Sequence, residues 1–263
     1  MKCLGLIGGI GWESTALYYR LINEEVRQRF GSLHSARLLV NSLSFDPLDT
    51  LVRTDRWDEV AAMLAEAGQR LERAGADALV LCSNQMHFVA DVIQVAVGIP
   101  LLHIGSAIGQ SLGRTREDVG LLGTRFTLEK GFLLEPRPDY PHWRKRRIHL
   151  PGESARERLD EIIFRELCRG LVRTESTNDV LGMARELRSK GARRVILASS
   201  ELVLLFGAEA LPLWLDDSTG LHAAHAVRWA LGEARAAADF SRVTMSEIPG
   251  GRLIKRSKLL RVS

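Results

Sequence analysis

The chain has 263 residues, enough for one large domain or two small ones, and its 46% hydrophobic and 26% charged residues are ordinary for a globular protein. Its net charge of +4 does not indicate a nucleic-acid partner, because residues 241–263 hold six Lys or Arg against one Glu and the rest of the chain is close to neutral. No RNA- or DNA-binding motif accompanies the basic run 142–147, HWRKRR, so we expect solvated loop charge there.

The chain has three cysteines at wide spacing, Cys3, Cys82 and Cys168. An odd number at such spacing argues against a disulfide framework and favours a reducing compartment. No apolar run reaches the roughly 18 residues of a membrane-spanning helix, and the first apolar run, CLGLIG, is typical of a strand rather than of a signal peptide. We therefore expect a cytoplasmic protein without membrane contact.

Short runs rich in Val, Ile and Leu alternate along the chain with longer amphipathic segments. Strand–helix alternation with nearly continuous apolar strands predicts parallel sheets covered by helices on both faces. The expected strands lie near residues 3–8, 37–43, 77–82, 100–104, 118–123, 146–150, 193–198 and 212–215. The expected helices include residues 14–30, 57–73, 154–169, 178–190 and 219–238.

One unit occurs twice: a Gly-Ala pair, an apolar strand and a small polar cluster, as in ALVLCSNQM (78–86) and RVILASSEL (194–202). This repeat predicts two similar Rossmann-like α/β domains with parallel sheets. We expect 1–116 plus about 213–240 to form the first domain, 117–212 the second, and 241–263 a basic C-terminal tail. Ligands bind beyond the carboxyl ends of parallel strands, which predicts an active site in the cleft between the domains.

The stretch LIGGIGWEST, 6–15, is a glycine-rich turn from a strand into a helix. Gly9, Ile10 and Gly11 begin the pattern of a dinucleotide-binding turn. Ser14 holds the place of the third glycine, however, and no acidic residue follows directly at the tip of the strand that ends near Leu43, so the fingerprint is incomplete. The backbone N–H groups and the positive end of the helix suit the carboxylate of a small substrate better.

The stretch LCSNQMH places Cys82 at the end of a strand and the start of a helix. The helix dipole would lower the pKa of a thiol at that point and raise its thiolate fraction. Ser83, Asn84 and Gln85 follow as neutral side chains that a substrate could contact. A buried core cysteine is an equally open interpretation of Cys82.

Three further residues lie at expected strand-to-helix connections. Arg53, expected in a loop, could grip a carboxylate bidentately, although solvent is the ordinary environment of a loop arginine. Thr124 follows a strand and a glycine and could donate to a substrate. His222 lies one turn into a helix and faces the cleft or merely packs.

Together these stretches resemble the aspartate/glutamate racemase family, cofactor-independent isomerases that invert the α-carbon of an amino acid with two cysteines. The resemblance implies two facing α/β domains, a homodimer, an acidic amino acid as substrate, and neither cofactor nor metal. It extends from about residue 2 to 231 in the stretches GLIGGIGWESTALYYRLINE, LHSARLL, RAGADALVLCSNQMH, LLGTRFTLE, EIIFRELCRG, GARRVILASSEL and LDDSTGLHAAHAV.

The resemblance also implies roles for single residues. Cys82 corresponds to one acid/base, and the second cysteine position falls on Ser199, which Ser200 and Glu201 follow. A serine hydroxyl is a far weaker base than a thiolate and needs an adjacent base, for which Glu201 is available. Gly11 and Gln85 also depart from the serine and threonine that are common in the family, so the substrate preference is less well determined than the fold.

Two other functions stay open. The chain could be a one-thiol relative, of the decarboxylase or isomerase type, in which Cys82 transfers a proton on one face only. It could also be a non-catalytic protein that binds dicarboxylates or amino acids. In the first case one enantiomer alone would exchange its α-proton, and in the second case substrates would bind without exchange.

Overall fold

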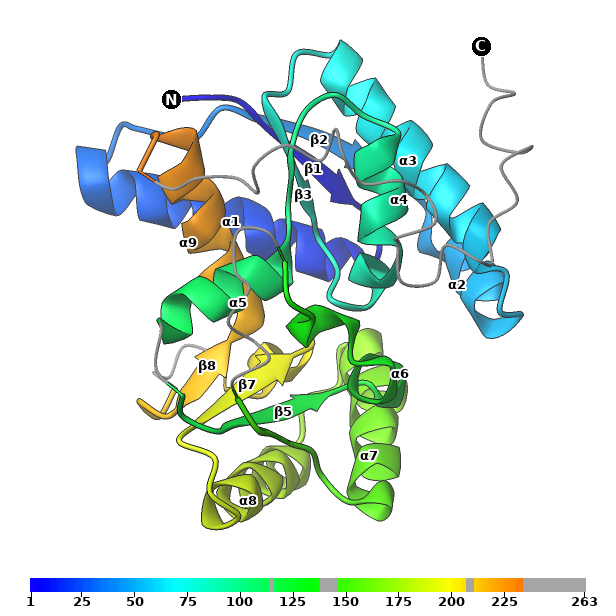
Figure 1. Ribbon diagram of the computed structural model, residues 1–263, viewed down its shortest axis with the longest axis vertical. Coiled ribbons are helices and arrows are strands. Elements are labelled where there is room, and N and C mark those ends of the chain that lie inside the picture. The colour runs from blue at the N-terminus through cyan, green and yellow to red at the C-terminus, as the bar shows by residue number, and fades with distance from the viewer. Residues whose placement is uncertain (114–115, 138–145, 207–210, 234–263) are drawn as a thin grey trace.

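The computed structural model describes residues 1–113, 116–137, 146–206 and 211–233 (Figure 1). The expected basic tail, 241–263, and residues 142–145 of the basic run lie outside the described residues. Residues 114 and 115, within the segment where the domain boundary is expected, also lie outside them.

Two parallel sheets organise the chain, one in the upper and one in the lower half of Figure 1. Each has four strands, in the order β2-β1-β3-β4 in the first sheet and β6-β5-β7-β8 in the second. The α/β fold with two Rossmann-like domains is therefore confirmed. The strands are β1 (Leu4–Gly8), β2 (Leu38–Ser42), β3 (Ala78–Leu81), β4 (Leu101–Leu102), β5 (Val119–Gly123), β6 (Ile148–His149), β7 (Arg194–Ala198) and β8 (Leu215–Asp217).

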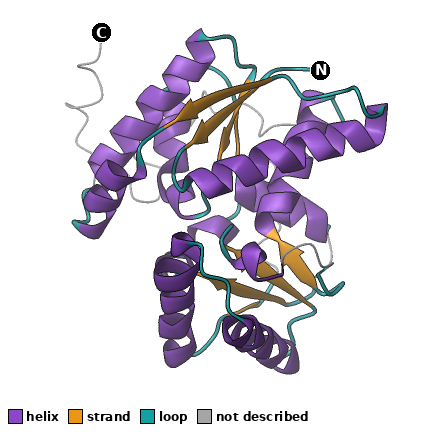
Figure 2. Ribbon diagram, turned by 180° about the vertical axis from the view of Figure 1, so that it is seen from behind, coloured by secondary structure: helices purple, strands orange, loops and turns teal. Residues whose placement is uncertain are grey.

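Helices pack on both faces of the sheets (Figure 2). They are α1 (Trp12–Phe30), α2 (Phe45–Arg53), α3 (Trp57–Arg73), α4 (Ala90–Val95), α5 (Ile104–Leu112), α6 (Arg125–Lys130), α7 (Glu153–Asp160), α8 (Thr174–Ser189) and α9 (Ser218–Ala230). In the part of the chain that the structure describes, no helix has the length and apolarity needed to cross a membrane.

The side chains of a strand point alternately to the two faces of its sheet. The central strands are buried because core side chains pack against both of these faces. In β3, Leu79 and Leu81 pack in the core below α3 and α4, whereas Ala78 and Val80 pack in the core between the sheet and helices α1 and α9. Both faces are apolar, which explains why the strand is a nearly continuous apolar run. This alternation also decides which residues at the strand end can reach the cleft.

Two elements differ from the expected ones. The segment 154–169 is not one α-helix: α7 continues as a π-helical turn, Glu161–Glu166, and ends in the 3₁₀ turn Leu167–Arg169. A π turn shifts the helical register, so the residues after it face a different direction. The strand expected over 100–104 is shorter, because His103 caps α5 by accepting a hydrogen bond from the Gly105 N–H at 3.0 Å.

The chain passes from the second sheet back to the first at α9. The strand β8 pairs with β7 in the second sheet, although the expected boundary assigns this segment to the first domain. Helix α9 packs instead in the core of the first sheet, through Ala223, Val227 and Trp229. We therefore propose that the boundary lies between β8 and α9, a few residues beyond the expected position.

Candidate functional site

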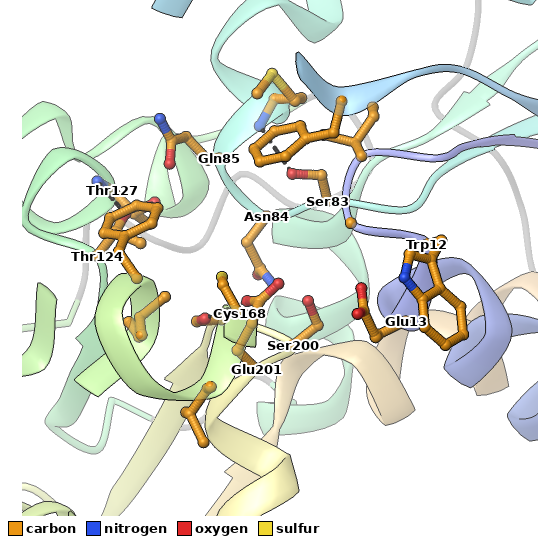
Figure 3. A pocket seen from close by; sticks show the side chains of 18 of the residues that line it. Trp12, Glu13, Ser83, Asn84, Gln85, Thr124, Thr127, Cys168, Ser200 and Glu201 are labelled. Carbon is orange, nitrogen blue, oxygen red and sulfur yellow. Dashed lines mark hydrogen bonds between the residues drawn. The ribbon is translucent and has the colours of Figure 1, made fainter. Parts of the chain in front are cut away.

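A cavity of about 460 Å³ lies where the carboxyl ends of the two sheets meet (Figure 3). Its walls come from the glycine-rich turn after β1, the turn after β3, the start of α6, the π-helical turn and the turn after β7. The sequence-predicted residues that line it are Gly9, Ile10, Gly11, Ser83, Asn84, Gln85, Thr124, Ser199, Ser200 and Glu201. Segments far apart in the sequence thus form one site.

The glycine-rich turn is held in a conformation that suits glycine. Gly9 and Gly11 have φ angles of 76° and 67°, and a Cβ at Gly9 would lie 2.0 Å from the carbonyl oxygen of Leu43. The Gly9 N–H donates to the Thr15 hydroxyl at 2.8 Å, so this donor is already engaged within the protein. The turn therefore forms a close-fitting wall at the start of α1.

The structure places Cys82 in the core and not on the wall of the cavity. Its side chain has 0% exposure and packs in the same core as Val80, with Sγ 3.8 Å from the Val80 carbonyl oxygen. Burial raises the pKa of the Cys82 thiol, which opposes the thiolate expected at a helix start. The expectation that Cys82 faces the cleft is corrected by the strand alternation, since Cys82 is in phase with Val80.

Strand pairing shows that Ser83 holds the place in the first sheet that Ser199 holds in the second. Leu81 pairs with the fourth residue of β1, and Leu197 pairs with the fourth residue of β5. Ser83 lies two residues after Leu81, and Ser199 lies two residues after Leu197. Both serines line the cavity. The internal repeat therefore relates two serines rather than Cys82 and a serine.

Ser199 is hydrogen bonded to a carboxylate. Its hydroxyl donates to Oε2 of Glu201 at 2.6 Å, while the Ser14 hydroxyl donates to Oε1 at 3.2 Å. The Ser200 and Ser14 hydroxyl oxygens lie 2.6 Å apart. Because Ser14 belongs to α1 and the other residues follow β7, this network joins the two halves of the molecule across the cavity.

Asn84 has an amide nitrogen with no hydrogen-bond partner in the part of the chain that the structure describes. Its Oδ1 accepts a hydrogen bond from the Ser218 hydroxyl at 3.0 Å, which fixes the amide orientation. Its Nδ2 is buried on the cavity wall and has no hydrogen-bond partner among the described residues. A buried donor of this kind is costly to leave unpaired, so it is suited to bind an acceptor atom of a ligand.

Thr124 serves first as the N-cap of α6. Its oxygen accepts from the Thr127 N–H at 3.2 Å, and its hydroxyl donates to the Thr127 Oγ1 at 2.9 Å. Both threonines line the cavity. The capping bonds hold the two hydroxyl groups at the wall.

Two expected site residues lie outside this cavity. His222 has 0% exposure and is held between the Tyr18 hydroxyl at 2.8 Å and the Leu102 carbonyl oxygen at 2.7 Å. Arg53 ends helix α2 instead of standing in a loop; its side chain is 75% exposed and pairs with Asp49 at 2.6 Å. It lines a separate, adjoining pocket of about 400 Å³.

Among the wall residues that the sequence interpretation missed, two are ionisable, Glu13 and Cys168. Glu13 lies in the first turn of α1, within a stretch already matched to the family, and Cys168 follows the π-helical turn. Desolvation, followed by the negative charges of Glu201, Glu13 and Asp49, raises the pKa of the Cys168 thiol to about 12. At neutral pH this thiol is protonated, and nothing in the spacing ELCRG alone indicates its position in the cleft.

Buried histidines support the turn after β3. The His87 Nδ1–H donates to the Ser83 carbonyl oxygen at 2.7 Å, and its Nε2 accepts from the Ile104 N–H at 3.2 Å. The ring of His87 contacts those of His103 and His222 at centroid distances of 4.7 and 5.5 Å. Burial lowers the pKa of all three rings, which are therefore neutral at pH 7.

These histidines, with His225, predict a loss of stability in acid. Their folded pKa values lie below 6.5, about 3 for His87 and about 4 for His225, so the unfolded chain binds more protons once the pH falls below about 6.5. Each lowers the free energy of unfolding by about 1.4 kcal/mol per pH unit. Burial raises the pKa of Asp217 to about 6, which offsets one proton between about pH 4 and 6.

Urea unfolding between pH 7.5 and 5 measures this slope. In His225→Phe the slope below about pH 6.5 should fall by about 1.4 kcal/mol per pH unit, because one proton that only the unfolded chain binds is removed. The replacement breaks no hydrogen bond of the His225 ring, since neither ring nitrogen has a partner among the described residues. The exposed His34 provides the control, and His34→Gln should leave the slope unchanged. Stability independent of pH below 6.5 would contradict the prediction.

Comparison with known proteins identifies the family. A sequence model of the Asp/Glu/hydantoin racemase family matches residues 7–226. A candidate Asp/Glu racemase from Yersinia pestis is 38% identical, with a TM-score of 0.77 over 88% of this chain and 100% of that chain. An aspartate racemase homologue from Pyrococcus horikoshii OT3 is 28% identical, with a TM-score of 0.73 over the same shares. An aspartate racemase from Picrophilus torridus, 15% identical over 88% of this chain and 95% of that chain, shares the fold with a TM-score of 0.65. The resemblance seen in the sequence is confirmed, and the chain belongs to the Asp/Glu/hydantoin racemase family.

Proposed function

We propose that the protein is an amino-acid racemase that removes and returns the α-proton without pyridoxal phosphate, using hydroxyl groups at the ends of both sheets. Family membership supports racemase activity. The observation that carries the finer proposal is the 2.6 Å hydrogen bond from the Ser199 hydroxyl to Glu201, on the wall of a cavity that Ser83 also lines. Figure 3 draws Ser83 and Glu201 on opposite sides of this cavity.

Inversion needs a base on one face of the α-carbon and an acid on the other. On one face, Ser199 takes the α-proton while its own proton passes to Glu201, so that Glu201 ends protonated. On the other face, the Ser83 hydroxyl returns a proton to the carbanion and regains one from water, and the hydroxide left behind takes the proton from Glu201, which restores the site. In the reverse direction Ser83 takes the α-proton while its own proton passes to water, and Ser199 returns a proton to the carbanion; the hydronium formed then restores the Ser199–Glu201 pair. The Asn84 amide donates to the substrate carboxylate, where negative charge develops.

Ser83 takes the role that the resemblance assigns to Cys82. Ser83 lines the cavity and matches Ser199 in the strand register, whereas the thiol of Cys82 is enclosed by the core. Hydroxyl groups are much poorer acids and bases than thiols near pH 7, so we expect slow turnover. The homodimer and the cytoplasmic location implied by the sequence stay predictions.

Two variants test whether Ser83 or Cys82 is the acid/base group at the end of the first sheet. Ser83→Ala should reduce α-deuterium incorporation from D2O by about 100-fold or more, the usual contribution of an acid–base group. Cys82→Ala should keep the exchange rate within about threefold and cost only about 1–2 kcal/mol of stability for the small cavity. Urea unfolding of each variant confirms the fold. If folded Cys82→Ala loses exchange and Ser83→Ala does not, the assignment of Ser83 is wrong.

Replacing a hydroxyl by a thiol should raise the rate. We expect Ser199→Cys to accelerate racemisation at least about tenfold, because a thiol has a pKa several units closer to neutral than a hydroxyl. Loss of optical rotation together with deuterium incorporation measures this. Ser189→Cys, at an exposed helix end away from the cavity, adds the same group without effect and serves as the control. No gain in Ser199→Cys would remove Ser199 from the acid/base pair.

A non-catalytic amino-acid-binding protein is the second candidate, because hydroxyl groups occupy both proposed acid/base positions, Ser83 and Ser199. In D2O, each enantiomer is followed for deuterium incorporation and optical rotation. Exchange of both enantiomers with loss of rotation supports the racemase. Exchange of one enantiomer supports one-sided chemistry, for which Cys168 is the cysteine that lines the cavity. Binding by calorimetry without exchange supports the binding protein.

A further inference from the structure

The cavity carries negative charge without a matching cation. Glu13 and Glu201 line it, and among the described residues on its wall there is no Arg, Lys or His. Both oxygens of Glu201 accept hydrogen bonds from hydroxyl groups, as the two oxygens of a carboxylate can. A substrate's α-ammonium group would neutralise part of this charge, whereas a side-chain carboxylate would add to it.

Most of the remaining wall is apolar. Large side chains from five separate segments surround the space next to Ser83 and Asn84, and several of them are exposed to solvent in this open cavity. They are Ile10, Trp12, Leu43, Phe45, Met86, Ile163, Phe164, Leu167 and Leu204. Exposed apolar side chains gathered in a concave site favour a ligand that covers them with apolar surface.

Three arginines line the adjoining pocket rather than this cavity. Arg53, Arg165 and Arg169 line that pocket, and the shared wall between the two spaces consists of uncharged side chains, Phe45 and Phe164 among them. Arg53 is already paired with Asp49 at 2.6 Å. Arg53, the arginine expected to grip a substrate carboxylate, therefore lies outside the walls that hold Ser199 and Asn84.

We propose that the site selects amino acids with an uncharged, apolar side chain, such as methionine, and disfavours aspartate and glutamate. The inference deepens the proposed racemase function and rests on it. A carboxylate moved from water into this cavity would lose hydration and meet Glu13 and Glu201 without a cation to offset them. An apolar side chain instead gains by covering the aromatic and aliphatic wall.

The test compares L-methionine, L-glutamine, L-glutamate and L-lysine in D2O. We expect kcat/KM for α-deuterium incorporation to be at least about tenfold higher for methionine than for glutamate, with the isosteric, uncharged glutamine in between. Faster exchange of glutamate or lysine than of methionine would overturn the proposal while leaving the racemase function intact.

Calorimetry separates failure of the substrate class from failure of the reaction. If none of the four amino acids exchanges, the racemase function fails for them, and the dissociation constants then decide the substrate class. Tighter binding of methionine than of glutamate supports the proposal. Tighter binding of glutamate, or no binding of methionine, overturns it.

Glu13 provides a specificity variant with a matched control. In Glu13→Gln, the preference for methionine over glutamate should fall by about threefold, the size of one partly screened charge interaction. Glu175 also stands exposed in the first turn of a helix, α8, but does not line the cavity, so Glu175→Gln should leave the preference unchanged. An unchanged preference in Glu13→Gln would contradict the role of the cavity charge.

Arg53→Gln tests the competing explanation. If Arg53 reaches an acidic side chain from the adjoining pocket, this variant weakens glutamate exchange or binding and leaves methionine unaffected. Such a result would overturn the proposal. If the proposed preference is correct, the ratio of kcat/KM for methionine to kcat/KM for glutamate is the same in Arg53→Gln as in the parent protein.

Discussion

The parallel pairing of the central strands, β1 with β3 and β5 with β7, is the constraint on which the site depends. Because both pairs have the same register, the two sheets end at equivalent points and direct equivalent residues into the cavity. Side-chain alternation then buries Cys82 and leaves Ser83 at the wall opposite the Ser199 turn. A slip of one residue in either pair would exchange a core side chain for a cleft side chain.

Buried and partly buried hydrogen bonds hold the turns beyond these strands in place. His87 holds the carbonyl group of Ser83, and Ser218 orients the amide of Asn84. Glu201 accepts hydrogen bonds from hydroxyl groups in both halves of the molecule, those of Ser199 and Ser14. The site is therefore pre-organised by polar contacts that span the interface between the sheets, which limits the reorganisation needed during proton transfer.

The charge of the cavity links the chemistry to the substrate. In the proposed mechanism the carboxylate that accepts the Ser199 hydrogen bond, Glu201, receives the Ser199 proton, and in the proposed substrate preference the same group repels an anionic side chain. Family membership predicts the reaction type more securely than the substrate, because the reaction depends on residues at the strand ends and the preference depends on the walls. Those walls include Cys168 and Phe164, which a π-helical turn brings to the cavity.

The sequence by itself determined the α/β class, the two parallel sheets, the family and ten of the 23 residues of the cavity wall, since apolar periodicity, the internal repeat and glycine-rich turns are local signals. Only the tertiary structure decided that Cys82 is buried, that Ser83 holds the position in the first sheet that Ser199 holds in the second, and that Arg53 lies in a different pocket. A motif gives the order of neighbouring residues. Which of two neighbours faces the cleft is set by strand pairing across distant segments, and which charges share a cavity is set by the packing of one half of the molecule against the other.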